Sequence, residues 1–164
     1  MRHVQRAVLD PETERVKDVW DLAAFGLRGN LSFTKITQGW LREAAKRWAA
    51  DDLPRRRGKD TAGPVRHYLV SLAALSESLR ANRPDRGEHP GVLGRGDIEA
   101  FPRRLAFLAA EARVSVDARP RICREVRHVL TRMRALGLTR RGRPGAEGVS
   151  LQLCKPRVIQ DRPL

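Results

Sequence analysis

The clearest pattern of apolar positions in this chain lies between Arg119 and Arg141. Apolar side chains recur there every three or four residues, which places them on one face of a helix. These positions are Ile122, Val126, Val129, Leu130, Met133 and Leu136. Gly137 follows directly and is a natural C-terminal stop. The pattern predicts an amphipathic helix that packs against a core and ends just before Gly137.

The same spacing predicts three further helices upstream, over residues 37–51, 64–79 and 97–112. Thr37 is a suitable cap for the first, Pro64 is favoured in the first turn of the second, and Asp97 is a suitable cap for the third. Pro102 lies inside the third range, where it removes a backbone donor. We therefore expect this helix to start late or to kink.

The remaining segments lack helical periodicity. Residues 1–36 form an irregular N-terminal segment, in which Leu31, Phe33 and Ile36 give at most a short extended piece. Residues 140–164 are expected to be a disordered basic tail. The helical domain is then 37–139, and its four helices predict an all-α fold, a compact bundle around one core.

Charge is concentrated at the C-terminal end of the chain. The 164 residues carry a net charge of +14, and residues 113–164 hold 13 basic against 4 acidic groups. On the polar side of the Arg119–Arg141 helix, only Glu125 offsets the arginines. A basic helix face of this kind is typical of nucleic-acid binding, because each neutralised phosphate releases counterion. The alternative is that a high genomic GC content has raised the arginine content everywhere, with no meaning for function.

Several functional classes find no support in the sequence. Apolar runs are too short for a membrane span and the start lacks a secretory signal, so we expect a cytoplasmic protein with no membrane partner. Cys123 and Cys154 lack ligands at zinc spacing. Gly91, Gly94 and Gly96 do not have dinucleotide-binding spacing. The histidines have no nucleophile motif beside them. We expect no metal, no cofactor and no enzymatic activity.

Four pieces of the chain, in their order, carry a resemblance to a known family. They are ITQGWLREAAKRW at 36–48, VRHYL at 65–69, GDIEAF at 96–101 and RPRICREVR at 119–127. The chain resembles, from about Trp20 to Thr139, the N-terminal core-binding domain of phage-type integrases of the tyrosine recombinase family, in a form similar to those of actinobacteria. The resemblance implies a SAM-like four-helix bundle that clamps DNA at a recombination site.

The resemblance also implies which residues contact DNA, because the second and fourth helices of that domain lie toward the major groove. The matching positions here are Arg66, His67, Ser71, Arg121, Arg124, Arg127, His128, Thr131 and Arg134. We expect base contacts from Arg124, Arg127 and Thr131. Further phosphate contacts are expected from Lys46 and from a basic loop made of Arg55, Arg56, Arg57 and Lys59.

The chain departs from the family where catalysis is concerned. The one tyrosine, Tyr68, lies on a predicted apolar face, and the only His-x-x-Arg spacing, His3 to Arg6, is explained by chance. We therefore expect a truncated or remnant integrase that binds double-stranded DNA in integration or recombination, while a catalytic recombinase or other integrase subunits supply the chemistry. Two alternatives stay open: a basic helical interaction or regulatory module that binds an acidic protein, and a stand-alone enzyme.

Overall fold

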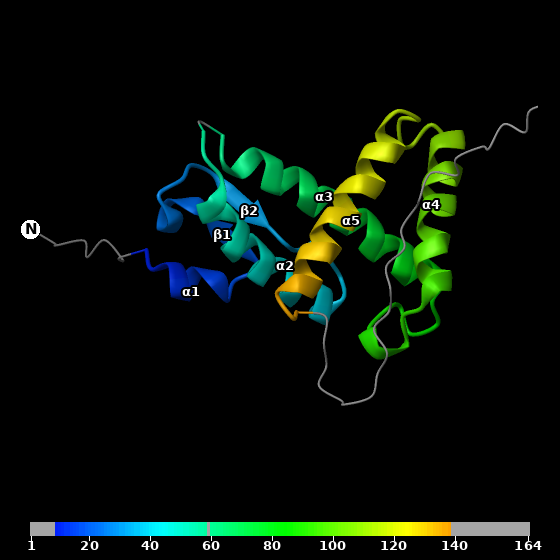
Figure 1. Cartoon of the computed structure of the whole chain (residues 1–164), viewed down its shortest axis with the longest axis horizontal. Helices are drawn as coiled ribbons and strands as arrows, with labels where there is room; N and C mark the ends of the chain where they lie inside the picture. The colour runs from blue at the N-terminus through cyan, green and yellow to red at the C-terminus, as the bar shows by residue number, and fades with distance from the viewer. Residues whose placement is uncertain (1–8, 59, 139–164) are drawn as a thin grey trace, which may run out of the picture.

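The computed structural model describes residues 9–58 and 60–138, and this part of the chain is mostly helical (Figure 1). Its α-helices are α1 (Pro11–Arg15), α2 (Gly39–Asp52), α3 (Ala62–Asn82), α4 (Arg95–Ala110) and α5 (Ala118–Ala135). Two short strands are present, β1 (Val19–Asp21) and β2 (Asn30–Ser32). Single 3-10 turns lie at η1 (Leu22–Phe25), η2 (Leu53–Arg55) and η3 (Pro90–Val92).

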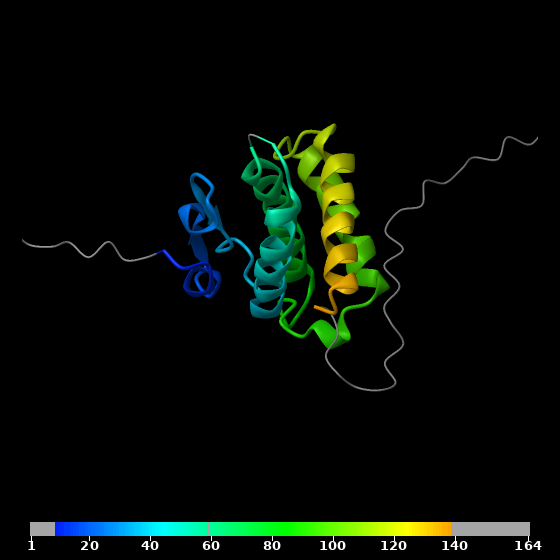
Figure 2. The same cartoon turned by 60° about the vertical axis from the view of Figure 1, so that its left-hand side comes forward.

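The long helices pack on one another around a shared core. Helix α3 contacts α2, α4 and α5, and α5 also contacts α2 and α4. Figure 2 shows α4 and α5 on one side of α2 and α3, and the strands on the other side. The core includes the apolar faces of α2, α3, α4 and α5. Because α5 is supported from several sides, the position of its outward face is well defined.

The four helices predicted from periodicity are confirmed, with differences at their ends. Helix α2 begins at Gly39 rather than Thr37, whose N–H instead donates to Ser76 Oγ at 2.9 Å. Of the late start or kink expected for α4, the late start is wrong, because the helix begins at Arg95. Asp97 lies in its first turn and its carboxylate accepts from the Gly94 N–H at 2.8 Å. This bond satisfies a donor at the helix start, and α4 continues through Pro102 to Ala110.

The described part of the N-terminal segment, residues 9–36, is more regular than expected, because the short extended piece expected at Leu31 is strand β2 of an antiparallel β-hairpin. Trp20 of β1 pairs with Leu31 of β2, and both are fully buried, while Val19 and Ser32 beside them are exposed. The alternation of buried and exposed positions is typical of a strand. Each strand has only three residues, too few for its period to stand out in the sequence.

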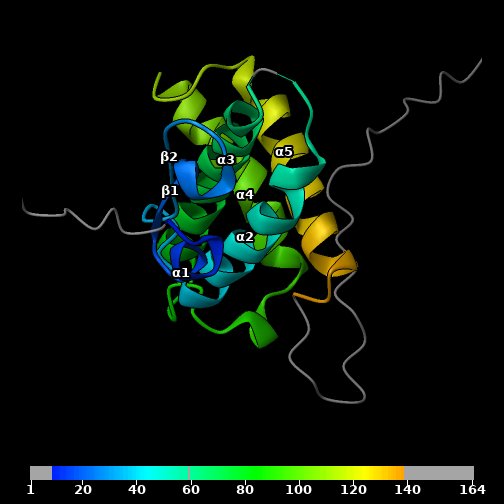
Figure 3. The same ribbon diagram turned by 90° about the vertical axis from the view of Figure 1, so that its left-hand side faces the viewer.

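This hairpin is joined to the helices by a continuous core. The Trp20 ring centroid lies 4.7 Å from that of Phe33 and 5.2 Å from that of Phe25. Trp20, Leu31 and Phe33 belong to the same buried cluster as the helix residues. Viewed from the strand side, β1 and β2 lie in front of the helices (Figure 3). The core therefore runs across the boundary expected at residues 36 and 37.

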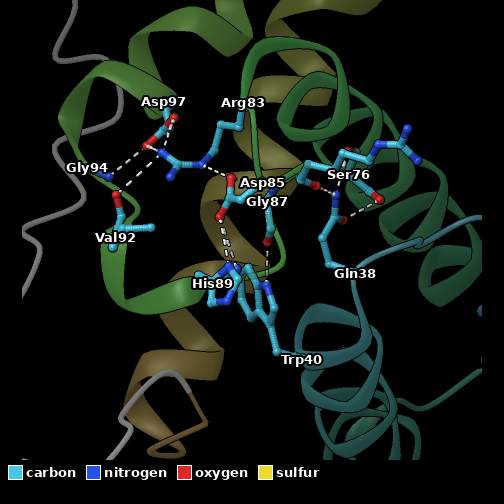
Figure 4. Close-up of polar contacts among 11 residues, drawn as sticks. Gln38, Trp40, Ser76, Arg83, Asp85, Gly87, His89, Val92, Gly94 and Asp97 are labelled. Atoms are coloured by element: carbon cyan, nitrogen blue, oxygen red, sulfur yellow. Dashed lines mark hydrogen bonds and ion pairs between the residues drawn. The ribbon is translucent and has the colours of Figure 1, made fainter.

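The connection between α3 and α4 is held by a buried amide (Figure 4). Gln38 is fully buried, and its Nε2 donates to the carbonyls of Ser76 at 3.0 Å and Arg86 at 2.8 Å. Its Oε1 accepts from Ser76 Oγ at 2.6 Å. The Trp40 indole N–H donates to the carbonyl of Gly87 at 2.8 Å. These bonds tie the start of α2 to the end of α3 and to the loop behind it.

A charged cluster fixes the rest of this loop. The Arg83 guanidinium donates to Asp85 at 2.7 Å and to both oxygens of Asp97 at 3.1 and 3.0 Å. The bond from Arg83, together with the N–H groups of Gly87 and His89, holds the pKa of Asp85 well below its ordinary value. The start of α4 is thereby linked to the end of α3.

The disordered tail expected at residues 140–164 lies outside the described residues. Among the described helices, none is both long and apolar enough to cross a lipid bilayer.

Candidate nucleic-acid interface

Helix α5 buries the face that its sequence predicts. Its buried residues are Val126, Val129, Leu130 and Met133, and Ile122 and Leu136 are half-buried. Gly137 adopts φ 72°, and the N–H of Leu138 donates to the Met133 carbonyl at 2.9 Å, which closes the helix end. The helix is thus docked along its length, with its other face turned to solvent.

The outward face of α5 is basic. Its exposed residues include Arg121, Arg124, Arg127, His128, Thr131 and Arg134. Within the described residues, Arg124, Arg127 and Arg134 make no ion pair. The one acid on the helix, Glu125, is half-buried and accepts from Arg121 at 3.1 Å. Most of the positive charge on this face is therefore uncompensated.

Arginines on α4 have different surroundings. Arg95 and Arg103 both pair with Glu99 on the same helix, at 2.6 and 3.6 Å. Arg104 lies 3.9 Å from Glu77 of α3. A high arginine content alone therefore does not explain α5, because the described part of the chain places carboxylates beside these α4 arginines and leaves Arg124, Arg127 and Arg134 of α5 without them.

Tyr68 joins the basic loop, α3 and α5 into one surface. The His128 ring of α5 stacks on Tyr68 of α3, with centroids 5.1 Å apart and an interplanar angle of 25°. The guanidinium carbon of Arg56 lies 5.4 Å from the centroid of the Tyr68 ring. From the core side, Trp48 meets the same ring edge-on at 5.6 Å. Tyr68 is half-buried, so the contact fixes the loop close to α5.

Two carboxylates at the end of α2 hold three arginines of this surface. Asp51 Oδ1 accepts from Arg55 Nη2 at 2.8 Å, and Asp51 Oδ2 accepts from Arg132 Nη2 at 3.0 Å. Asp52 accepts from Arg56 Nε. Asp51 therefore bridges the basic loop and α5, two segments that are far apart in the sequence.

The α3 residues Arg66 and His67 are exposed, and Arg66 has a structural contact as well. Its Nε donates to the Asn30 carbonyl at 3.2 Å and its Nη2 donates to the Arg28 carbonyl at 3.4 Å. A Cβ on Gly29, which has φ 86°, would lie 2.8 Å from that same Nη2. Arg66 thus fastens the hairpin loop to α3.

Two residues expected to contact DNA are turned away from solvent. Lys46 is buried, and its Nζ lies 2.8 Å from Asp18 and 2.7 Å from Glu43. Burial alone would lower the pKa of Lys46, but the bonds that its ammonium donates to Asp18 and Glu43 together outweigh burial and raise the pKa above its ordinary value. Ser71 is also buried, and its hydroxyl donates to Glu125. Neither side chain is placed to reach a phosphate.

Lys46 and Ser71 are both turned away from solvent because of tertiary contacts. Lys46 faces the hairpin, whose Asp18 supplies a carboxylate that no pattern within α2 could reveal. Ser71 faces α5, and its hydroxyl donates to Glu125, the one acid on that helix. Both remain part of the fold, where they join α2 to the hairpin and α3 to α5, and we remove both from the candidate interface.

The other basic-loop residues are accessible where they are described. Arg57 is exposed and Arg55 keeps a side-chain exposure of 60% despite its bond to Asp51. Lys59 lies outside the described residues. Sequence reasoning missed the roles of Asp51, Asp52 and Tyr68. The spacing of Asp51 and Arg55, four residues apart at a helix end, was the available signal for the first.

No group of three or more His, Cys, Asp or Glu side chains in the described part of the chain could hold a metal ion. The surface offers mainly arginine guanidinium groups, which donate to anions and have no acceptor atom. The arrangement can therefore bind phosphate or carboxylate oxygens and can contact base edges.

Comparisons with known proteins add no identification, since no family model, curated protein or solved structure matches this chain.

Proposed function

We propose that this protein binds double-stranded DNA through the exposed face of α5, as an integrase-like core-binding domain in DNA integration or site-specific recombination. The observation that carries the proposal is the uncompensated basic face of a well-docked helix, where Arg124, Arg127 and Arg134 make no ion pair within the described residues. An α-helix fits the major groove of B-DNA, and arginines on its outward face then reach phosphates and base edges.

The roles within the surface follow from position. Arg124 and Thr131 lie seven residues apart near the middle of the exposed face, and Arg127 lies between them, so these three are assigned to base edges. Arg121, His128 and Arg134 flank them and are assigned to phosphates. Arg55, Arg56 and Arg57 of the loop add phosphate contacts beside Tyr68, and His67 of α3 extends the same surface. Lys59 is part of the proposal from sequence alone.

The finer fold assignment belongs to this proposal as well. Helices α2, α3, α4 and α5, which share one core, support a SAM-like bundle, to which a small hairpin is added. The cytoplasmic location and the association with a catalytic recombinase or other integrase subunits are likewise proposed. The alternative, a basic module that meets an acidic protein, uses the same surface and differs in its preference among polyanions.

A salt titration tests the proposal. Fluorescence anisotropy of a labelled random duplex is followed at several salt concentrations, with single-stranded DNA and an acidic polypeptide as competitors. We expect duplex preference, and an affinity that falls by about three orders of magnitude between low and moderate salt if about six phosphates are contacted. Equal displacement by the acidic polypeptide would favour the alternative, and no binding at low salt would reject DNA binding.

Catalysis by the chain itself is not part of the proposal, and Tyr68 offers the test. Its ring is packed among Trp48, His128 and Arg56, which supports a structural role. We expect Tyr68→Phe to leave the duplex affinity within about twofold, because the ring contacts are kept. Neither form should give a covalent DNA adduct on a denaturing gel. An adduct with the tyrosine form alone would contradict this reasoning.

A further inference from the structure

The two acids at the end of α2 lie in an unusual place for a surface that attracts polyanions. Asp51 and Asp52 occupy the last turn of the helix, where the partial negative charge of the backbone carbonyls disfavours carboxylates. Their side chains are only 24% and 14% exposed. Where a local rule of this kind is broken, a compensating role is expected. Here the two carboxylates contact three arginines, Arg55 and Arg56 of the basic loop and Arg132 of α5.

The geometry points to a specific use for these acids: we infer that Asp51 and Asp52 act as an internal counter-anion that restrains the DNA affinity of the basic surface. This inference rests on the proposed function and concerns its regulation. The two carboxylates, at the end of α2, pair with Arg55, Arg56 and Arg132 and neutralise part of their charge. They thereby lower the affinity for any polyanion and leave Arg124 and Arg127 to dominate binding.

Distances and exposure support this use over a purely structural one. Arg55 is 60% exposed although its Nη2 is held at 2.8 Å by Asp51, so its other N–H groups stay available to an incoming phosphate. Arg132 is 34% exposed and is held at 3.0 Å by the same carboxylate. A phosphate that approaches either arginine must compete with Asp51 or share the guanidinium with it. Because one carboxylate restrains both the loop and α5, a single residue affects two parts of the surface.

Restraint of this kind favours discrimination among DNA sites. Phosphate contacts carry no sequence information, and they supply nearly all of the binding to random DNA. A surface with fewer available phosphate contacts depends more on its base contacts. The acids therefore raise the ratio of specific to non-specific binding at the expense of total affinity.

The test replaces both acids by their amides, Asp51→Asn with Asp52→Asn, in the full chain. The amide oxygen still accepts from an arginine, so the fold is expected to survive, as thermal melting followed by circular dichroism will show. Single Asp51→Asn serves as a second variant that leaves Asp52 in place. The matched control is Glu77→Gln with Glu99→Gln, which gains the same two charges and releases arginines on α3 and α4.

Affinity for a random duplex is measured by anisotropy across salt for all four proteins. The double Asp variant should bind about tenfold more tightly or better at about 0.1 M salt, and its salt slope should steepen by about one to two units, as one or two phosphate contacts are gained. Single Asp51→Asn should give an intermediate gain. The control should change affinity by less than about threefold, the effect expected of net charge alone.

The outcomes distinguish failure of the restraint by Asp51 and Asp52 from failure of the proposed DNA binding. If the wild type binds and the double Asp variant binds equally or more weakly, the inference is overturned while the proposed function stands. An equal gain in the control overturns it too. If neither the wild type nor the double Asp variant binds, both proposals fail. Binding by the variant alone supports the restraint and contradicts DNA binding by the unmodified protein.

Discussion

Replacing Arg124 and Arg127 with alanine should abolish most of the DNA affinity without harming the fold. Both side chains are exposed and make no ion pair within the described residues, so their removal should change the free energy of unfolding by less than about 0.5 kcal/mol. Each of these arginines also brings a positive charge beside the phosphates that border the groove, and each phosphate charge that is neutralised contributes a slope of about 0.9 in log affinity against log salt. At about 0.1 M salt this corresponds to about eightfold per contact, and to about 60-fold for two.

The assay is duplex anisotropy across salt, with urea unfolding in parallel. The matched control is Arg95→Ala with Arg103→Ala, which removes the same charge from α4, where both arginines pair with Glu99. We expect the control to lose less than about threefold, the share of general electrostatics. The reasoning is refuted if the α5 variant keeps its affinity and slope, or if the α4 control loses as much.

Three further predictions concern the fold that supports the surface. Gln38→Ala should destabilise the protein by about 2–4 kcal/mol in urea unfolding, because the buried Ser76 carbonyl and the part-buried Arg86 carbonyl lose their donor; a loss below about 1 kcal/mol would contradict the network. Gly87→Ala should cost more stability than Gly26→Ala, since both have positive φ but only at Gly87 would a Cβ meet another carbon, at 2.8 Å; equal losses would argue against the close packing. The bond from Arg83 lowers the pKa of Asp85 in the folded state, so its stabilisation is full above the unfolded value, near 3.9, and is lost as pH falls below it. Asp85→Asn should therefore flatten the acid side of the stability curve, and an unchanged curve would contradict this assignment.

The helices could be predicted from sequence because their apolar periods are long. The stripe of α5 carries several turns of evidence, and Val126, Val129 and Met133 are buried as it requires. The hairpin could not be predicted, because three-residue strands show no usable period. Its core residue Trp20 is buried by Phe25 and Phe33, which is a tertiary effect.

The candidate surface was only partly predictable for the same reason. The exposed positions of Arg124, Arg127 and Thr131 follow from the helix period alone. The burial of Lys46 and Ser71 does not follow from it, because their partners Asp18 and Glu125 lie in segments distant in the sequence. The type of a residue indicates which groups its side chain can bind. Whether that side chain is already paired within the protein depends on the fold.

Locating bound DNA on the protein tests the central claim most directly. An NMR titration of the labelled 18.5 kDa chain with a duplex oligonucleotide reports backbone amide shifts residue by residue. We predict the largest changes at Arg124, Arg127, His128 and Thr131 of α5 and in the loop around Arg57, with little change at Arg95 and Glu99 of α4. Changes confined to α4, or spread evenly over every exposed arginine, would contradict the claim that the outward face of α5 is the DNA-binding surface.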